Sequence, residues 1–195
     1  YIPNPLSFYN NNLSTLNNRT IINIGRLTSD KRQDLLLKIW REVSEKHPDW
    51  KLKIVGTGEL KNELIQTIKN FNLVNSVKVI EPIKDVESLF LNSSIFTFTS
   101  RYEGFGMVLA EAMACGVPCI SFDIPSGPRD IIENNIDGFL IEDNNIRQYI
   151  NKLDLLMSDT NKRLYMGKMA RENVKIFLDY KIEKKWNSLL KLGVA

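Results

Sequence analysis

Short apolar runs alternate with amphipathic stretches from about residue 20 onwards, and this alternation constrains the fold more than any other feature. Each run is almost continuously apolar, as expected for strands that are buried on both faces of a parallel sheet. The predicted strands are Ile21–Gly25, Leu52–Gly56, Val77–Ile80, Ile95–Thr99 and Val117–Phe122. Their spacing of roughly 20–30 residues is typical of βαβ units with right-handed crossovers. The pattern therefore predicts an α/β fold with a doubly wound parallel sheet.

The stretches between these runs have apolar residues along one side of a helix. Four helices are predicted there, over Leu35–Val43, Leu60–Ile68, Val86–Asn92 and Gly106–Cys115. Beyond Asn145 the chain is predicted to be mostly helical, over Ile146–Ser158, Asn161–Val174 and Asp179–Leu192. We expect three parts: a turn-rich linker over residues 1–18, a folded domain over residues 19–178, and a C-terminal helix over residues 179–195.

Length and composition are those of one ordinary globular domain. The 195 residues carry a net charge of +3, and no basic stripe is interleaved with aromatic residues, which argues against nucleic-acid binding. We find neither an apolar run of about 20 residues that could span a bilayer nor a signal peptide. We expect a cytoplasmic location, with peripheral attraction to the inner face of the cytoplasmic membrane left open. The chain begins at Tyr1 rather than Met, which suggests part of a longer protein.

The residues that commonly bind metals do not form a metal-binding pattern here. Cys115 and Cys119 are four residues apart without His or acidic partners nearby, and we interpret them as buried, reduced thiols. His47 is interpreted as a surface histidine. No Asp-x-Asp pair occurs, which argues against enzymes that hold a diphosphate through a metal on that motif. We predict no metal site and no cofactor.

Charged and glycine residues follow the first two predicted strands. Gly25 ends the first strand and Arg26 follows at once, with Lys31 expected in the first turn of the next helix. Two cations beside a helix N-terminus suit a diphosphate, although solvated surface charges would give the same pattern. After the second strand, Gly56-Thr57-Gly58-Glu59 begins like a dinucleotide fingerprint, but Lys61 stands where its third glycine belongs. We interpret this segment as a tight turn.

The sharpest motif follows the fourth strand and runs from Glu103 to Glu111, with Gly104 and Gly106 just before an apolar helix. Glycine lets the backbone approach a ligand, and the first N–H groups of a helix are free to bind it. Carboxylates eight residues apart are too distant to act on one atom, but they suit the two ends of an extended ligand. A surface ion pair of Glu111 is the alternative, yet a carboxylate on so apolar a helix needs a partner.

Together these segments resemble the C-terminal domain of the family 4 glycosyltransferases, which are retaining enzymes with the two-domain GT-B fold. The resemblance covers roughly residues 2 to 180 and depends above all on Glu103 and the run Glu111-Ala112-Met113-Ala114-Cys115-Gly116-Val117-Pro118. The Gly25-Arg26-Leu27 junction and a turn at Asp137-Gly138-Phe139-Leu140 match in the same order. The resemblance implies a Rossmann-like doubly wound sheet that forms one half of a GT-B enzyme, with a helical C-terminal extension.

The resemblance implies a role for each candidate residue. The catalytic candidates are Glu103, which would hold hydroxyls of the transferred sugar, and Arg26 and Lys31, which would hold the diphosphate and stabilise the leaving group. Glu111 would hold the ribose hydroxyls of the nucleotide. Six further residues would complete the donor site, chiefly through their backbone: Gly25, Gly104, Phe105, Gly106, Met107 and Val108.

The implied reaction transfers a hexosyl group, with retention, from a nucleotide diphosphate sugar to a glycan or lipid-linked acceptor. A UDP-sugar is the expected donor, and bacterial surface polysaccharide synthesis is the expected pathway. In the family an N-terminal domain binds the acceptor, so this chain by itself is expected to bind the donor but to transfer little sugar. The apolar side of the last helix would pack either on that domain or on its own: Ile182, Trp186, Leu189 and Leu190.

Two segments depart from the family's pattern. The family usually has a glycine after the third strand, where this chain reads Val79-Ile80-Glu81-Pro82-Ile83. Ser126 and Asp130, on either side of Gly127, replace a glycine and a glutamate, which suggests a subgroup with its own donor preference. Two alternative functions stay open: a nucleotide-sugar-binding module without activity, and a GT-B-like UDP-sugar epimerase. An oxidoreductase is disfavoured because the glycine fingerprint is incomplete.

Overall fold

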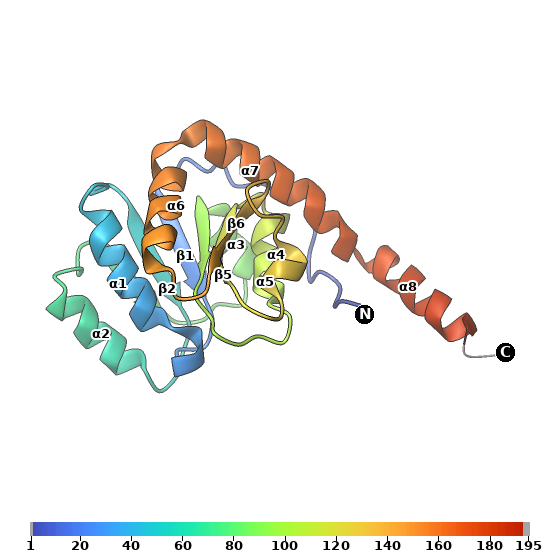
Figure 1. Cartoon of the computed structure of the whole chain (residues 1–195), viewed down its shortest axis with the longest axis horizontal. Helices are drawn as coiled ribbons and strands as arrows, with labels where there is room; N and C mark the ends of the chain where they lie inside the picture. Colours follow the sequence, from blue (N-terminus) through green and yellow to red (C-terminus); the bar gives the residue numbers. More distant parts are fainter. Residues whose placement is uncertain (1, 193–195) are drawn as a thin grey trace.

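The computed structural model describes residues 2–192 and folds into three layers, with a central sheet between two layers of helices (Figure 1). Six parallel strands form the sheet in the order β3-β2-β1-β4-β5-β6. Their bounds are β1 Thr20–Ile24, β2 Lys51–Val55, β3 Val77–Ile80, β4 Ile95–Phe98, β5 Cys119–Asp123 and β6 Gly138–Glu142. The strand order reverses between β1 and β4, which is the topological switch point of a doubly wound sheet. The predicted Rossmann-like parallel sheet is confirmed.

Helices cover both faces of the sheet (Figure 1). On one face lie α1 Gln33–Ser44, α2 Lys61–Asn70 and α6 Ile146–Ser158, and on the other α3 Val86–Leu91, α4 Met107–Ala114 and α5 Pro128–Ile131. α7 Thr160–Asn173 contacts both α6 and α4, and α8 Asp179–Leu192 projects from the body of the domain. Among the described residues, two 3₁₀ turns complete the helical elements: η1 Ser29–Lys31 and η2 Val174–Phe177.

Each helical layer packs its own apolar cluster against the sheet. Trp40 of α1 and Tyr149 of α6 are fully buried on one face, and Phe90 of α3 is fully buried on the other. All four residues of β4 are buried, as the continuous apolar run predicted for a strand covered on both faces. The rigid sheet fixes the directions in which its loops leave the carboxyl edge.

Two segments differ from the sequence-based predictions. The predicted turn at residues 137–140 is instead the start of an edge strand, since β6 pairs with β5 from Gly138 to Glu142. An Asp-Gly pair is a turn signal, and only the hydrogen bonds to β5 make this short segment a strand. Lys31 does not lie in the first turn of α1 but in η1, because Arg32 has a φ of 51° and separates the two elements.

Several smaller predictions can be compared with the described residues. Cys115 and Cys119 are free and buried, as expected, and burial raises the pKa of the Cys115 thiol to about 12. His47 is not a surface histidine, because its half-buried ring lies 2.7 Å from a carboxylate oxygen of Asp154. Within the part of the chain that the structure describes, no helix is both long and apolar enough to cross a membrane.

The two ends of the chain differ in how closely they pack. The predicted linker lies along the domain, where Leu6 is buried and its N–H donates to the carbonyl of Phe177 at 2.9 Å. On α8, Ile182 is buried against the domain, whereas three apolar side chains are largely exposed: Trp186, Leu189 and Leu190. Tyr1 of the predicted linker and residues 193–195 of the predicted C-terminal helix lie outside the described residues.

Candidate functional site

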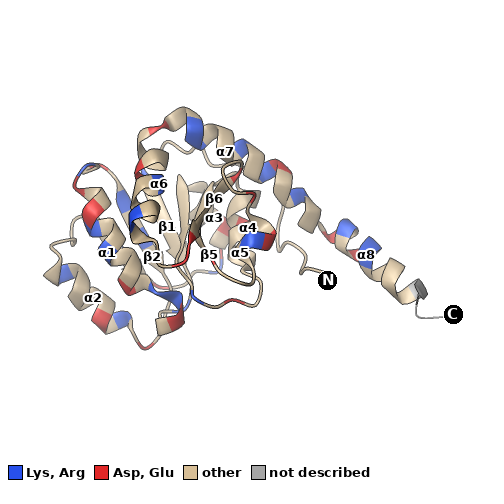
Figure 2. Ribbon diagram, in the orientation of Figure 1, with Lys and Arg blue, Asp and Glu red and all other residues tan. Residues whose placement is uncertain are grey.

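The loops that follow β1 and β4 meet at the carboxyl edge of the sheet, at the switch point. The N–H of Arg101 donates to the carbonyl of Asp30 at 2.7 Å, and the hydroxyl of Thr99 donates to the carbonyl of Lys31 at 2.8 Å. Figure 2 shows basic and acidic residues next to one another between the end of β1 and the start of α1. The tertiary structure thus brings together candidates from distant parts of the sequence.

Lys31 and Glu103 form the central pair of this site. Lys31 Nζ lies 2.5 Å from Glu103 Oε1, and the two side chains are only 13% and 16% exposed. Lys31 Nζ is also 3.7 Å from Asp30 Oδ2. The hydroxyl of Thr28 donates to Asp30, and this bond together with the nearby Lys31 charge lowers the pKa of that carboxyl. Lys31 is therefore a fixed cation with two carboxylates beside it.

Arg26 completes the cationic part of the site from a more open position. Its side chain is 75% exposed, and the guanidinium lies 4.0 Å from Asp30 Oδ2. Its backbone is fixed, because the side-chain amide of Gln33 donates to the Arg26 carbonyl at 2.9 Å and the preceding Gly25 N–H donates to the Val55 carbonyl at 3.0 Å. Arg26 can therefore turn toward a ligand, whereas Lys31 is held in place.

Arg32 anchors the loop that follows β4, although sequence reasoning did not single it out. Its buried guanidinium donates to the carbonyls of Thr99 at 2.7 Å and Ser100 at 3.1 Å. It also pairs with Asp143 at 2.8 Å and bonds Asn144 at 3.1 Å. In the sequence, Arg32 is one member of a short charged run, and nothing in its spacing distinguishes a buried anchor from a surface charge.

The glycine-rich loop before α4 packs against a second loop from β5. α4 begins at Met107, directly after Gly106, so the Met107 and Val108 amides lie in its first turn. Ser126 Oγ donates to the Gly104 carbonyl at 2.7 Å. A Cβ atom on Gly127 would lie 2.4 Å from the Phe105 carbonyl oxygen, so the two backbones touch there. The junction after β5 therefore holds the α4 loop in position.

Glu111 lies on α4, is half-buried and has a hydrogen-bond partner, which its apolar helix led us to expect. Ser7 Oγ donates a hydrogen bond to Glu111 Oε1, a partner that the sequence did not reveal. Burial raises the pKa of Glu111, and the bond from Ser7 opposes that shift. Within the described part of the chain, no lysine, arginine or histidine pairs with Glu111. The surface ion pair considered from the sequence is therefore absent there.

An apolar pocket of about 200 Å³ opens beside Gly25 and Arg26, at the carboxyl ends of β1, β2 and β3. It is lined by Ile24, Gly25, Arg26, Val55, Gly56, Thr57, Pro82, Ile83, Val86 and Leu89. Two of these lining residues touch through their backbones, because a Cβ atom on Gly56 would lie 1.9 Å from the Gly25 carbonyl oxygen. A ligand that carries a flat apolar group and a negatively charged group would suit this edge. The apolar group would enter the pocket, and the charged group would lie beside Arg26 and Lys31.

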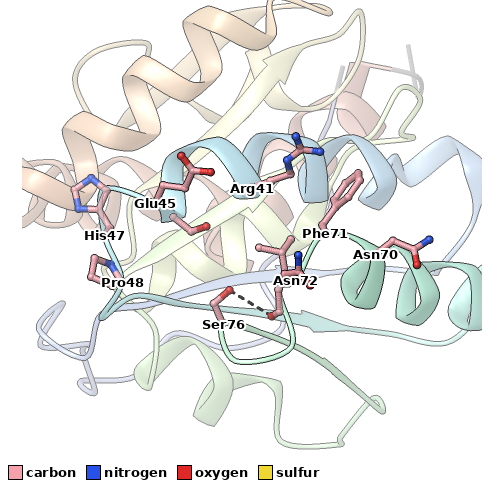
Figure 3. Close-up of a pocket in the computed structure, with 10 residues that line it drawn as sticks. Arg41, Glu45, His47, Pro48, Asn70, Phe71, Asn72 and Ser76 are labelled. Atoms are coloured by element: carbon pink, nitrogen blue, oxygen red, sulfur yellow. Dashed lines mark hydrogen bonds between the residues drawn. The ribbon is translucent and has the colours of Figure 1, made fainter.

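A larger pocket of about 540 Å³ lies at the opposite, amino edge of the sheet (Figure 3). It is formed where α1 and α2 end, and Arg41 stacks there over the ring of Phe71 at 5.0 Å. None of the residues predicted to act on a ligand lines it. The switch-point edge, where cations, a fixed carboxylate and helix-start amides converge, is therefore the candidate site.

The fold and the candidate site define a Rossmann-like α/β domain with its candidate ligand site at the switch point. The family model described as "Glycosyl transferases group 1" matches residues 9–173. The chain belongs to the group 1 glycosyltransferases, which have the GT-B type of fold.

Individual relatives agree with this assignment. An uncharacterized glycosyltransferase of Haemophilus influenzae is 39% identical over 183 residues, which cover 92% of this chain and 51% of that protein. The amylovoran biosynthesis glycosyltransferase AmsD of Erwinia amylovora is 35% identical over 170 residues, covering 87% and 47%. The chain thus spans about half the length of these curated relatives.

A solved structure gives the same picture. A mutant of S. aureus TarM, in complex with UDP, fondaparinux and alpha-GlcNAc-glycerol, superimposes with a TM-score of 0.84 at 29% identity. The match covers 97% of this chain and 37% of that one. The fold described above is therefore one part of a longer chain in this neighbour.

Proposed function

We propose that this chain is the donor-binding half of a retaining glycosyltransferase. It binds a nucleotide diphosphate sugar, with UDP as the nucleotide, and serves the transfer of a hexosyl group to a glycan or lipid-linked acceptor. The observation that carries this proposal is the Lys31–Glu103 pair at the switch point, with Arg26 and the apolar pocket beside it. The UDP complex of TarM and the amylovoran pathway of AmsD support the nucleotide and bacterial surface polysaccharide synthesis.

The proposed roles follow from the chemistry of the bond that breaks. When the anomeric C–O bond breaks, negative charge develops on the leaving diphosphate and positive charge on the sugar ring. Fixed cations such as Lys31, together with Arg26 and the amides of Met107 and Val108, stabilise the diphosphate. Glu103 binds hydroxyls of the sugar, with the backbone of residues 104–106 beside it. We propose that these groups suffice without a metal or cofactor.

The nucleotide occupies the other end of the site in this proposal. The base enters the apolar pocket that Pro82 and Ile83 help to form, and the ribose hydroxyls donate to the Glu111 carboxylate. The acceptor is bound by a further domain, and the protein acts in the cytoplasm or peripherally at the inner membrane face. The chain described here accordingly binds the donor but transfers little sugar by itself.

Thermal unfolding with a panel of nucleoside diphosphates and UDP-sugars tests donor binding. For a Kd near 10 μM, a ligand at 1 mM adds about 2.7 kcal/mol of stability, which raises the Tm by roughly 5–10 °C. The shift should persist in EDTA, disappear in Glu111→Ala, and remain in Glu63→Ala, which removes an exposed carboxylate from α2. A Tm that no nucleotide changes would refute the proposed function, and a shift that EDTA abolishes would refute its independence from metal.

Transfer is tested separately with a radiolabelled UDP-sugar. The 195-residue chain should release little UDP and label little acceptor. Rapid turnover by this chain alone would contradict the proposed division of labour between domains. Interconversion of the free donor sugar without any acceptor would favour an epimerase instead.

A further inference from the structure

Ser7 lies at a fixed point of the N-terminal segment. The neighbouring residue Leu6 is buried, and its N–H is bonded to the Phe177 carbonyl at 2.9 Å. Further along, the Ser14 N–H donates to the Cys115 carbonyl at 2.9 Å, just beyond the end of α4. Because the segment is held at both places, the hydroxyl of Ser7 is presented to α4 from a defined position.

The carboxylate that Ser7 contacts is poorly solvated and lacks a cationic partner among the described residues. Ser7 Oγ donates to Oε1 of Glu111, and the described structure shows no further hydrogen bond to this carboxylate. A half-buried carboxylate needs donors, because lone pairs without partners cost free energy. The second oxygen and the remaining lone pair of the first can therefore accept hydrogen bonds from a ligand.

A ribose presents two neighbouring hydroxyl donors. A carboxylate can accept from both only if the plane of its two oxygens faces the two hydroxyls. The side chain of glutamate has several rotamers, and a hydrogen bond to one oxygen selects among them. The bond from Ser7 also opposes the rise in the pKa of Glu111 that burial causes, which favours the ionised, acceptor-only form.

We propose that Ser7 is a positioning residue, which holds the Glu111 carboxylate so that it accepts both ribose hydroxyls and thereby selects ribonucleotides over 2′-deoxyribonucleotides. This inference depends on the proposed function, since it assigns the ribose of the donor to Glu111. It adds to that function a specificity determinant from the N-terminal segment, outside the sheet, the helices and the loops that form the rest of the site.

Calorimetric titration with UDP and 2′-deoxy-UDP tests the role of Ser7. We expect the unchanged chain to bind UDP at least about tenfold more tightly than 2′-deoxy-UDP, because the carboxylate loses one donor. Ser7→Ala should weaken UDP binding about tenfold and change 2′-deoxy-UDP binding by less than about twofold. Ser7→Thr keeps the hydroxyl and should restore the preference. Ser158→Ala, an exposed serine at the end of α6, is the matched control and should change neither affinity.

The pH dependence of binding provides a second measurement. Without the Ser7 bond, Glu111 protonates at a higher pH, so UDP binding in Ser7→Ala should be lost at a higher pH than in the unchanged chain. A purely structural role for Ser7 would weaken both nucleotides equally and leave this pH profile unchanged.

The possible failures can be told apart. If UDP binds and Glu111→Ala abolishes binding, but Ser7→Ala behaves as the unchanged chain, the positioning role is wrong and the proposed function stands. Tighter UDP binding in Ser7→Ala would also overturn the positioning role, since Ser7 would then compete with the ribose for Glu111. If the unchanged chain binds no nucleoside diphosphate at all, the proposed function and this inference both fail.

Discussion

Replacement of Arg32 by alanine should destabilise the domain strongly. This is more than expected from the sequence, where Arg32 stands among other charged residues that are typical of a surface. The guanidinium is the donor to the carbonyls of Thr99 and Ser100, two residues that are fully or almost fully buried. Each buried acceptor left without a donor costs about 1–3 kcal/mol. Asp143 adds little, because its side chain is 37% exposed and water can solvate it.

With two such carbonyls, the expected loss in Arg32→Ala is about 2–6 kcal/mol of unfolding free energy. For a domain of this length, the Tm should fall by roughly 4–24 °C. The same substitution releases the loop that leads from β4 to Glu103, so nucleotide binding should weaken as well. Urea unfolding monitored by circular dichroism measures the first effect, and calorimetric titration with UDP measures the second.

Arg19→Ala is a matched control for this prediction. Arg19 also forms an ion pair, with Asp49 at 2.7 Å, but the two side chains are 59% and 73% exposed. Its φ of 47° resembles the 51° of Arg32, so any backbone cost of alanine in the left-handed region is similar in both variants. Arg19→Ala should lose less than about 1 kcal/mol. Equal losses in the two variants would refute the argument that Arg32 acts through buried carbonyls.

Two further predictions concern a glycine contact and a buried acid. Gly127→Ala places a Cβ atom 2.4 Å from the Phe105 carbonyl oxygen at a φ of 97°, so it should lose about 1–3 kcal/mol of stability and weaken UDP binding. Gly104→Ala meets no atom within 4 Å and should change the unfolding free energy by less than about 0.5 kcal/mol; similar urea midpoints for the two variants would contradict this reasoning. Burial raises the pKa of Asp137 from 3.8 to about 6, so its neutral form stabilises the fold below pH 3.8 and this contribution is lost as the pH rises through about 6. Relative to Asp137→Asn, the unchanged chain should lose up to about 3 kcal/mol of unfolding free energy between pH 4 and pH 7. Urea unfolding measures both pH profiles, and parallel profiles would contradict the role of Asp137.

Much of the fold could be predicted from the sequence because its signals are local. Continuous apolar runs mark strands covered on both faces, and five of the six strands of the sheet were predicted within two residues of their bounds. β6 was missed because its first residue, Gly138, and the preceding Asp137 give a turn signal, and only its pairing with β5 makes it a strand. An edge strand depends on a partner that is distant in the sequence.

The sequence by itself determined which residues are available at the site: the cations after β1, the two glutamates around the α4 start, and the glycines between them. Only the tertiary structure decided how they are partnered. Lys31 pairs with Glu103, Arg32 is buried under the β4 loop, and Ser7 reaches Glu111 from the N-terminal segment. The physical reason is that hydrogen bonds and ion pairs depend on distance in space. In a parallel sheet, residues 72 positions apart, such as Lys31 and Glu103, meet at one edge.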